Sequence, residues 1–192
     1  MTAKRIALFG GSFDPVHLGH IHIAQAAVDA LDLDLVLFVP CRQSPHKHDA
    51  PVATEEERLE MLDLATREIP WAAVSEVELL LPPPSYSWLT AESMREVFPT
   101  SRLFWLLGDD QWDAIEAWER PDHLARLVEF IVHSRNGTAA EKTGFRAHFI
   151  EGHHPASATR IRHAEAGKLP AEWLDPEVAG FVRSHGLYGQ GT

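Results

Sequence analysis

Short apolar runs alternate along the chain with longer segments in which apolar residues return every three or four positions. Short runs bounded by turn-forming residues are typical of buried strands, and the longer spacing is typical of helices with one buried face. Because alternating strands and helices form parallel strands joined by crossover helices, the pattern predicts an α/β fold, a doubly wound parallel sheet with helices on both faces. We expect strands at 5–9, 34–40, 72–79, 102–108 and 128–134, a weaker strand at 146–152, and helices at 18–31, 54–68, 87–98 and 120–130.

Local signals refine this arrangement. Thr54 is followed three positions later by Glu57, the spacing of a capping box, so a helix should begin just after Thr54. The breaker-rich stretches at 40–51 and 81–87 follow strand ends, and open α/β sheets bind ligands at that edge. Residues 155–188 have short helical patterns, which we expect to form a C-terminal helical extension of a single domain that spans the whole chain.

Composition narrows the class of partner. The 192 residues are 45% hydrophobic, enough for a substantial core, and carry a formal charge of -11. Proteins that hold long nucleic acids through their general surface are basic, so we expect no polynucleotide partner, whereas a small phosphorylated ligand needs only a local basic cluster. The single cysteine, Cys41, fits a reducing cytoplasm. No apolar window is long enough to predict a membrane span or a signal peptide.

The turn after the first strand, "GGSFDPVHLGH", carries more chemistry than a connection requires. Gly10 and Gly11 permit unusual backbone angles and let a ligand come close, and Gly19 opens the start of the first helix. Backbone N–H groups at a helix N-terminus favour phosphate. His17 and His20 are three positions apart, so on a first helical turn they share one face and can both donate hydrogen bonds to phosphate oxygens.

Metal ligation is an alternative for these histidines, because His17, His20 and His22 form an HxxHxH pattern. However, His22 should rotate away from the other two on a helix, and no carboxylate is spaced to complete a ligand set. Either histidine taken alone is also compatible with a solvated helix cap. The stretch matches neither GxxxxGK[ST] nor GxGxxG, the two common phosphate-binding loops.

The whole string closely resembles the GxFDPxHxGH signature of the HxGH nucleotidyltransferase superfamily. The resemblance implies a Rossmann-like fold and the transfer of a nucleotidyl group from a nucleoside triphosphate. It implies that His17 and His20 bind the triphosphate and stabilise the transition state. The ATP site that it implies includes Gly10, Gly11, Ser12, Phe13 and Gly19.

A second segment, "PASATRIRHAEAGK", offers further positive charge. Ser157 fits an N-cap, and Thr159 and Arg162 then lie on one face of the first turns, although a capped surface helix has the same pattern. "SATRIR" resembles the superfamily's closing motif, (I)SSTxIR, at these three positions and departs from it at Ala158. "SPHKH" resembles its PPHK, which implies that Lys47 folds over the polyphosphate.

The resemblance covers nearly the whole chain and points to the nicotinate-nucleotide adenylyltransferase family. "SYSWLTA" resembles that family's SYTxxTL and gives Ser87, whose hydroxyl suits either a pyridine carboxylate or a helix N-cap. "EAWERPDHL" resembles tWxxxxxL and gives Trp118, which suits either a pyridine ring or the core. "VHSRNG" resembles a segment that usually reads RPG and gives Arg135. "LLGDDQW" resembles GxD and gives Gly108 and Asp110, whose carboxylate could take ribose hydroxyls.

The implied reaction is direct: the phosphate of nicotinate mononucleotide attacks the α-phosphorus of ATP and pyrophosphate leaves. Catalysis would come from alignment and charge neutralisation by His17, His20, Lys47 and Arg162, with Mg²⁺ carried on the ATP. Three alternatives stay open: another small phosphate acceptor such as nicotinamide mononucleotide, a non-catalytic nucleotide-binding protein, and a metal-binding module that uses the twelve histidines. The sequence leaves a homo-oligomer open as well.

Overall fold

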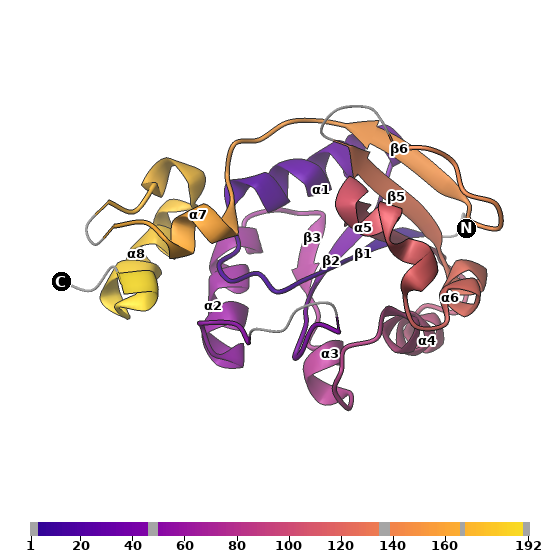
Figure 1. The fold of residues 1–192 in the computed structure, drawn as a ribbon, viewed down its shortest axis with the longest axis horizontal. Helices are drawn as coiled ribbons and strands as arrows, with labels where there is room; N and C mark the ends of the chain where they lie inside the picture. Colours follow the sequence, from indigo (N-terminus) through magenta and orange to yellow (C-terminus); the bar gives the residue numbers. More distant parts are fainter. Residues whose placement is uncertain (1–3, 46–49, 135–138, 166–167, 190–192) are drawn as a thin grey trace.

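The computed structural model describes residues 4–45, 50–134, 139–165 and 168–189. Its centre is a six-stranded parallel sheet in the order β3-β2-β1-β4-β5-β6 (Figure 1). The order reverses between β1 and β4, the point where open α/β sheets bind their ligands. The strands are β1 (Arg5–Gly11), β2 (Leu35–Pro40), β3 (Ala72–Val74), β4 (Arg102–Gly108), β5 (Glu129–Ser134) and β6 (Ala147–Glu151).

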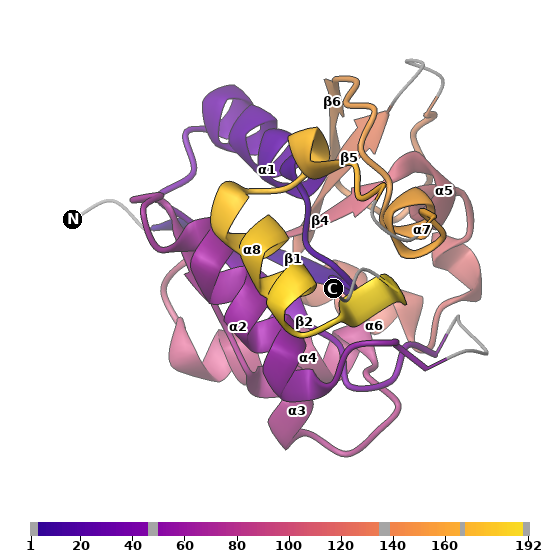
Figure 2. The same cartoon turned by 90° about the vertical axis from the view of Figure 1, so that its left-hand side faces the viewer.

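Helices cover both faces of this sheet (Figures 1 and 2). One face packs against α1, α2 and α8, and the other packs against α4, α5 and α6. The predicted Rossmann-like α/β fold is therefore confirmed. The helices are α1 (Leu18–Leu31), α2 (Glu55–Thr66), α3 (Val77–Leu80), α4 (Ser87–Val97), α5 (Asp109–Asp113), α6 (Pro121–Leu127), α7 (Ala158–Arg162) and α8 (Pro176–Ser184), with 3-10 turns at Ile115–Ala117, Ala171–Trp173 and Leu187–Gly189.

Strict alternation along the strands builds the two halves of the core. In β1, Ala7 and Phe9 belong to one buried cluster, while Ile6 and Leu8 belong to the cluster on the opposite face. Successive strand side chains point to opposite faces, and full burial of one large apolar side chain contributes about 1.5–3 kcal/mol. A one-residue shift in register would expose or misplace all four side chains, so burial fixes the position of the glycines that follow.

The C-terminal part forms the predicted helical extension and packs beside α2 (Figure 2). Val178 and Val182 of α8 are fully buried in the same cluster as the α1 and α2 side chains. Asp175 caps α8 by accepting the backbone N–H of Glu177 at 2.8 Å. Among the described helices, none combines the length and apolar character needed to cross a bilayer.

Two of the predicted elements need correction. The strand expected at 72–79 ends at Val74, because this edge strand pairs only with Val36–Phe38 of β2, and the chain then turns into α3. The helix expected at 120–130 ends at Leu127, because β5 begins at Glu129. The sequence also gave no sign of α5, whose five residues are too few to show a helical period.

The predicted capping box at the start of α2 is confirmed. The hydroxyl of Thr54 accepts the backbone N–H of Glu57 at 3.2 Å, and the Glu57 carboxylate accepts the backbone N–H of Thr54 at 2.8 Å. These bonds satisfy two of the backbone donors that a helix start leaves unpaired. They set where α2 begins, and therefore where its buried residue Arg58 meets the turn after β1.

Candidate active site

Two cavities lie at the carboxyl edge of the sheet, and the segment from β1 into α1 contributes to both. The imidazole cavity, of about 380 Å³, is lined by the start of α1, the end of β5 and the segment that leads into α7. The tryptophan cavity, of about 80 Å³, is lined by the end of β1, the segments after β2 and β3, and the indoles of Trp105 and Trp118. The turn between β1 and α1 therefore lines two cavities that differ in their chemistry.

Gly10 and Gly11 end β1 and line the tryptophan cavity. We expected them to supply backbone angles that other residues avoid, but neither has a positive φ. Space explains them instead: an added Cβ would lie 3.2 Å from Cζ2 of Trp105 at Gly10, and 3.1 Å from Cζ of Phe13 at Gly11. The two glycines allow aromatic rings to close directly over the strand end.

Phe13 takes the left-handed conformation, with a φ of 46°, which is unfavourable for a residue with a Cβ by about 1–3 kcal/mol. Packing offsets this cost, because the buried ring lies 5.7 Å from the Phe9 ring, 5.7 Å from the Phe38 ring and 5.1 Å from the His20 ring. The sequence assigned Phe13 to the ATP site. Its ring lines neither cavity and supports His20 from the core side.

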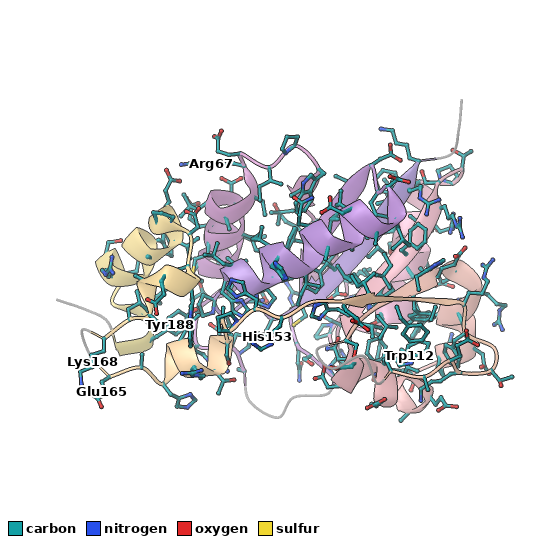
Figure 3. The ribbon with its side chains drawn as sticks, turned by 90° about the horizontal axis from the view of Figure 1, so that it is seen from above. Arg67, Trp112, His153, Glu165, Lys168 and Tyr188 are labelled. Carbon is teal, nitrogen blue, oxygen red and sulfur yellow. The ribbon has the colours of Figure 1, made fainter. Side chains whose placement is uncertain are left out.

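Asp14 ties the same turn to three distant segments. Its buried carboxylate accepts the backbone N–H groups of Val52 (2.8 Å) and Ala53 (3.1 Å) and the hydroxyl of Tyr188 (2.8 Å), a residue of the C-terminal extension (Figure 3). Its carbonyl oxygen accepts a hydrogen bond from Arg162 at 2.6 Å. Burial raises the pKa of the Tyr188 phenol, and the Asp14 carboxylate raises it further, so the phenol remains a donor.

His17 and His20 lie together at the start of α1. Their rings stack with centroids 3.7 Å apart and an interplanar angle of 18°, and both line the imidazole cavity. The backbone N–H of His17 donates to Nδ1 of His20 at 3.2 Å, which leaves Nε2 of a neutral His20 as the protonated nitrogen. An added Cβ at Gly19 would lie 2.9 Å from Nδ1 of His17, so a side chain there would displace the His17 ring.

Further imidazoles face the same cavity, namely His133 at the end of β5 and His153 and His154 before α7. Arg160 also lines it, and no carboxylate does among the described lining residues. Burial lowers the pKa of His154, and the neighbouring imidazoles of His22 and His153 lower it further. The described part of this cavity is therefore bounded by groups that are cationic or can become so.

The closing motif reaches the imidazole cavity through Ser157. Ser157 caps α7 as predicted, accepting the backbone N–H of Arg160 at 3.5 Å. Arg162 donates to the Asp14 carbonyl and lies 3.4 Å from the Thr159 hydroxyl, which agrees with one helical face for these two residues. Neither Thr159 nor Arg162 lines either cavity, so the guanidinium lies against the turn and not in the hollow.

Ser87 and Trp118, the two described acceptor candidates, both line the tryptophan cavity together with Ser12. Trp118 is 9% exposed and also belongs to a core cluster, so the two roles that the sequence left open are compatible. Ser87 is the first residue of α4, while Tyr86 holds the N-cap position, so the N-cap interpretation of Ser87 is wrong. The Ser87 hydroxyl is therefore not committed to capping.

Glu78 is a buried carboxyl that also lines the tryptophan cavity. The Thr90 hydroxyl donates to its Oε1 at 2.7 Å. Burial raises the pKa of Glu78 to about 7, against the opposing effect of hydrogen bonds from the Thr90 and Ser85 hydroxyls. Ser85 also accepts the backbone N–H of Arg42 at 3.0 Å, so these bonds join the segment after β2 to α4.

The remaining predicted residues lie apart from both cavities or outside the described ranges. Gly108 ends β4 and precedes α5, and an added Cβ there would lie 2.7 Å from Oδ1 of the exposed Asp110. Neither residue lines a cavity described above. Lys47 and Arg135 fall at 46–49 and 135–138, outside the described residues.

Sequence reasoning missed several residues of these sites. Asp14 stood inside the quoted motif without a role, and Glu78 gave no local signal because its burial depends on α3 and α4 packing together. The buried Arg58 of α2, which donates to the Ser12 carbonyl at 2.9 Å, was also missed. His153 and His154 entered the sequence interpretation only among the twelve histidines of a possible metal-binding module.

A metal module has no support in the described ranges: no group of three or more His, Cys, Asp or Glu side chains there could hold an ion. His22 lies away from the stacked pair, against Gly152, where an added Cβ would be 3.2 Å from its Nε2. Its ring centroid is 5.7 Å from that of His154. Five histidines, including the stacked pair, line the imidazole cavity.

Comparison with known proteins identifies the family of the chain. The Cytidylyltransferase-like family matches residues 8–164. A protein of Neisseria meningitidis serogroup B described as "Probable nicotinate-nucleotide adenylyltransferase" is 35% identical, covering 96% of this chain and 98% of its own. A protein of Carboxydothermus hydrogenoformans with the same description is 34% identical, covering 98% of this chain and 100% of its own.

Solved structures show the same fold. The Plasmodium falciparum nicotinic acid mononucleotide adenylyltransferase complexed with NaAD superposes with a TM-score of 0.78 at 17% identity, covering 98% of each chain. The same enzyme complexed with APC gives a TM-score of 0.72. With the family match over most of the chain and full-length relatives above 30% identity, the chain belongs to the nicotinate-nucleotide adenylyltransferase family, within the cytidylyltransferase-like proteins.

Proposed function

We propose that this chain, acting as a single nucleotidyltransferase domain, transfers AMP from ATP to nicotinate mononucleotide, giving deamido-NAD and pyrophosphate. The names of its full-length relatives support the reaction. The observation that carries the proposal is the stacked His17–His20 pair, which faces one cavity together with Ser157, a residue more than a hundred positions away in the sequence. We place the reaction in the cytoplasm, where the single thiol of Cys41 stays reduced.

The reaction needs alignment and charge neutralisation and no protein nucleophile. An oxygen of the acceptor phosphate forms a bond to the α-phosphorus of ATP, and the bond from that phosphorus to the oxygen shared with the β-phosphate breaks. Pyrophosphate leaves with the electron pair. His17 and His20 donate to the oxygens on which charge grows, and such donors stabilise the transition state more than the ground state.

The other proposed roles follow from position. Arg162 holds the turn through the Asp14 carbonyl and so fixes the direction of α1 and its two imidazoles. Gly19 and Ser157 border the phosphates, and Gly10, Gly11 and Ser12 form the strand end between the two substrates. The roles proposed for Lys47, Arg135, Phe13, Thr159, Gly108 and Asp110 rest on the resemblance of their motifs.

The tryptophan cavity suits the acceptor's pyridine ring. Trp118 offers an indole for the flat ring, and Ser87 at the start of α4 offers a hydroxyl to the nicotinate carboxylate. Glu78 lines the same cavity, and its ionised carboxylate repels the nicotinate carboxylate. Protonated Glu78 is neutral and does not repel it. Acceptor binding should therefore depend on the charge of Glu78.

The described side chains of the imidazole cavity do not suit Mg²⁺ as direct ligands, so we place the ion on the triphosphate of ATP. Magnesium prefers oxygen ligands and retains water, whereas the described lining of the imidazole cavity offers nitrogen donors and no carboxylate. The phosphates and water would then hold the ion, which supplies charge neutralisation on the triphosphate. Protein side chains orient the substrate around it.

Pyrophosphate release with ATP and a panel of acceptors tests the proposal. Nicotinate mononucleotide should give the highest kcat/KM, with nicotinamide mononucleotide and phosphopantetheine well below it. Product identity should be checked as deamido-NAD by mass spectrometry. A higher kcat/KM with another acceptor would show that nicotinate mononucleotide is not the substrate. ATP binding without pyrophosphate release for any acceptor would support a non-catalytic nucleotide-binding protein.

A further inference from the structure

We propose that His133, His153 and His154 form a second bank of the polyphosphate site, in the cavity that the His17–His20 pair also lines, and that binding of pyrophosphate or of the triphosphate of ATP takes up protons onto this imidazole cluster. The inference rests on the proposed function and extends it, because it assigns the cationic partners of the leaving group. The ligand class is an inorganic or nucleoside polyphosphate.

The geometry of the second bank comes from β5 and from the segment between β6 and α7. Figure 3 shows His153 in that segment, close to α1. An added Cβ at Gly152 would lie 3.1 Å from Nε2 of His133 and 3.2 Å from Nε2 of His22, so the absence of a side chain there lets imidazoles from β5 and α1 approach each other. The His22 ring in turn lies 5.7 Å from the His154 ring.

The charge of the described lining is unusual for a polyphosphate site. Five imidazoles and the guanidinium of Arg160 line the cavity, with no lysine and no carboxylate among the described lining residues. On neighbouring elements, Asp14 is engaged by the Tyr188 hydroxyl, and Asp109 accepts the Ser134 hydroxyl at 3.5 Å. A ligand with several negative charges therefore meets groups whose charge depends on pH near neutrality.

Crowding explains why protons should arrive with the ligand. Two protonated rings stacked 3.7 Å apart, as His17 and His20 are, repel each other, and a bound polyphosphate offsets this repulsion. The pKa of His154 is lowered by burial and by its neighbours His22 and His153. The backbone N–H of Ala156 donates to Nδ1 of His154 at 3.2 Å, so neutral His154 presents its proton on Nε2.

Linkage gives the sign of the effect. Protonated imidazoles bind the polyphosphate more tightly than neutral ones, so affinity should rise as pH falls toward 6. Uptake of about one proton makes the dissociation constant change by about tenfold per pH unit. A site built from lysine and arginine would show no such protein-derived dependence in this range, because both remain charged.

The test is isothermal titration calorimetry of the full chain with inorganic pyrophosphate, and separately with ATP, between pH 6.5 and 8.5. Each titration is run in two buffers of different ionisation enthalpy, because the difference in observed heat gives the number of protons taken up. The variant is the double substitution His153→Asn and His154→Asn, in an accessible segment. His133→Asn is the second variant, and His185→Asn on α8 is the matched control.

In wild type and in His185→Asn, we expect more proton uptake than in the variants, and an advantage in affinity over the variants that is larger at pH 6.5 than at pH 8.5. The double variant should lose most of the uptake and bind pyrophosphate about tenfold more weakly at pH 6.5, with little difference at pH 8.5. Because pyrophosphate titrates identically in all samples, the difference between proteins isolates the imidazoles. Equal uptake and equal affinity in wild type and both variants would overturn the inference.

The same preparations separate this inference from the proposed function. Wild-type protein that makes deamido-NAD but shows no protein-derived proton uptake would leave the function standing and remove the second bank. Wild-type protein that takes up protons when it binds pyrophosphate but transfers AMP to no acceptor would leave the second bank standing and remove the proposed function. If the double variant loses binding at every pH and also melts at a lower temperature, its loss of binding reflects unfolding. The proton uptake of His133→Asn then decides the inference.

Discussion

The two cavities are served by the same turn, yet they differ in charge and in how the chain builds them. The imidazole cavity is lined by cationic or protonatable groups, and the His17–His20 pair comes from one short motif. The tryptophan cavity combines two indoles with the buried carboxyl of Glu78. The stacked pair is therefore local in sequence, whereas the remaining lining of both cavities comes from distant segments that meet only after folding.

The largest expected effect comes from substitutions in the imidazole cavity. His17→Asn or His20→Asn should lower kcat by about 10²–10³-fold, because each removes a donor to charge that grows in the transition state. Pyrophosphate release under saturating ATP measures the effect, with His185→Asn as the matched control and thermal unfolding to confirm the fold. Unchanged kcat in both variants would contradict the roles proposed for the pair.

The next effect tests whether the two cavities bind different substrates. Ser87→Ala should raise the KM for nicotinate mononucleotide roughly tenfold or more while the KM for ATP stays unchanged, since a hydrogen bond to a charged group contributes about 1.5–3 kcal/mol. Ser87 does not cap α4, so the melting temperature should not change. A variant whose KM for ATP rises instead would place Ser87 on the nucleotide side.

A smaller effect concerns the carboxyl group of Glu78 in the tryptophan cavity. The pKa of Glu78 is raised to about 7 by burial, so its protonated fraction falls as pH rises through 7. The KM for nicotinate mononucleotide should therefore rise by up to about tenfold per pH unit above pH 7, as the ionised carboxyl repels the acceptor.

Glu78→Gln should flatten this dependence, and nicotinamide mononucleotide, which has a neutral carboxamide, should not show it in wild type. Steady-state KM values between pH 6 and 8.5 measure both effects. Parallel pH profiles for wild type and Glu78→Gln would assign the dependence to another group.

The smallest effect reaches the imidazole cavity from a distance. Tyr188→Phe removes the hydroxyl that donates to Asp14 and should cost about 1–3 kcal/mol of unfolding free energy, because the buried carboxylate loses a partner. We expect kcat to fall only a few-fold, since Arg162 and the N–H groups of Val52 and Ala53 still hold Asp14. Chemical denaturation and kcat on the same sample measure the two effects, and unchanged stability would show that the Asp14 carboxylate does not need the phenol.

The sequence by itself determined the sheet, its main helices and the residues of the first motif. The short apolar run at 5–9 predicted a strand, whose backbone geometry sends Ile6 and Leu8 to the face opposite Ala7 and Phe9. Three-residue spacing predicted His17 beside His20, because neighbours on one helical face depend only on local backbone geometry. The start of α2 at Thr54 followed from the same kind of local rule. These features needed no knowledge of the rest of the chain.

Tertiary structure alone decided which distant groups share a cavity and what charge they carry there. Burial of Glu78, the contact of Tyr188 with Asp14 and the approach of His133 to His22 across Gly152 each join segments that are far apart in the sequence. Desolvation and through-space repulsion act on distance and not on sequence separation, so neither the raised pKa of Glu78 nor the lowered pKa of His154 could be read from the residues alone.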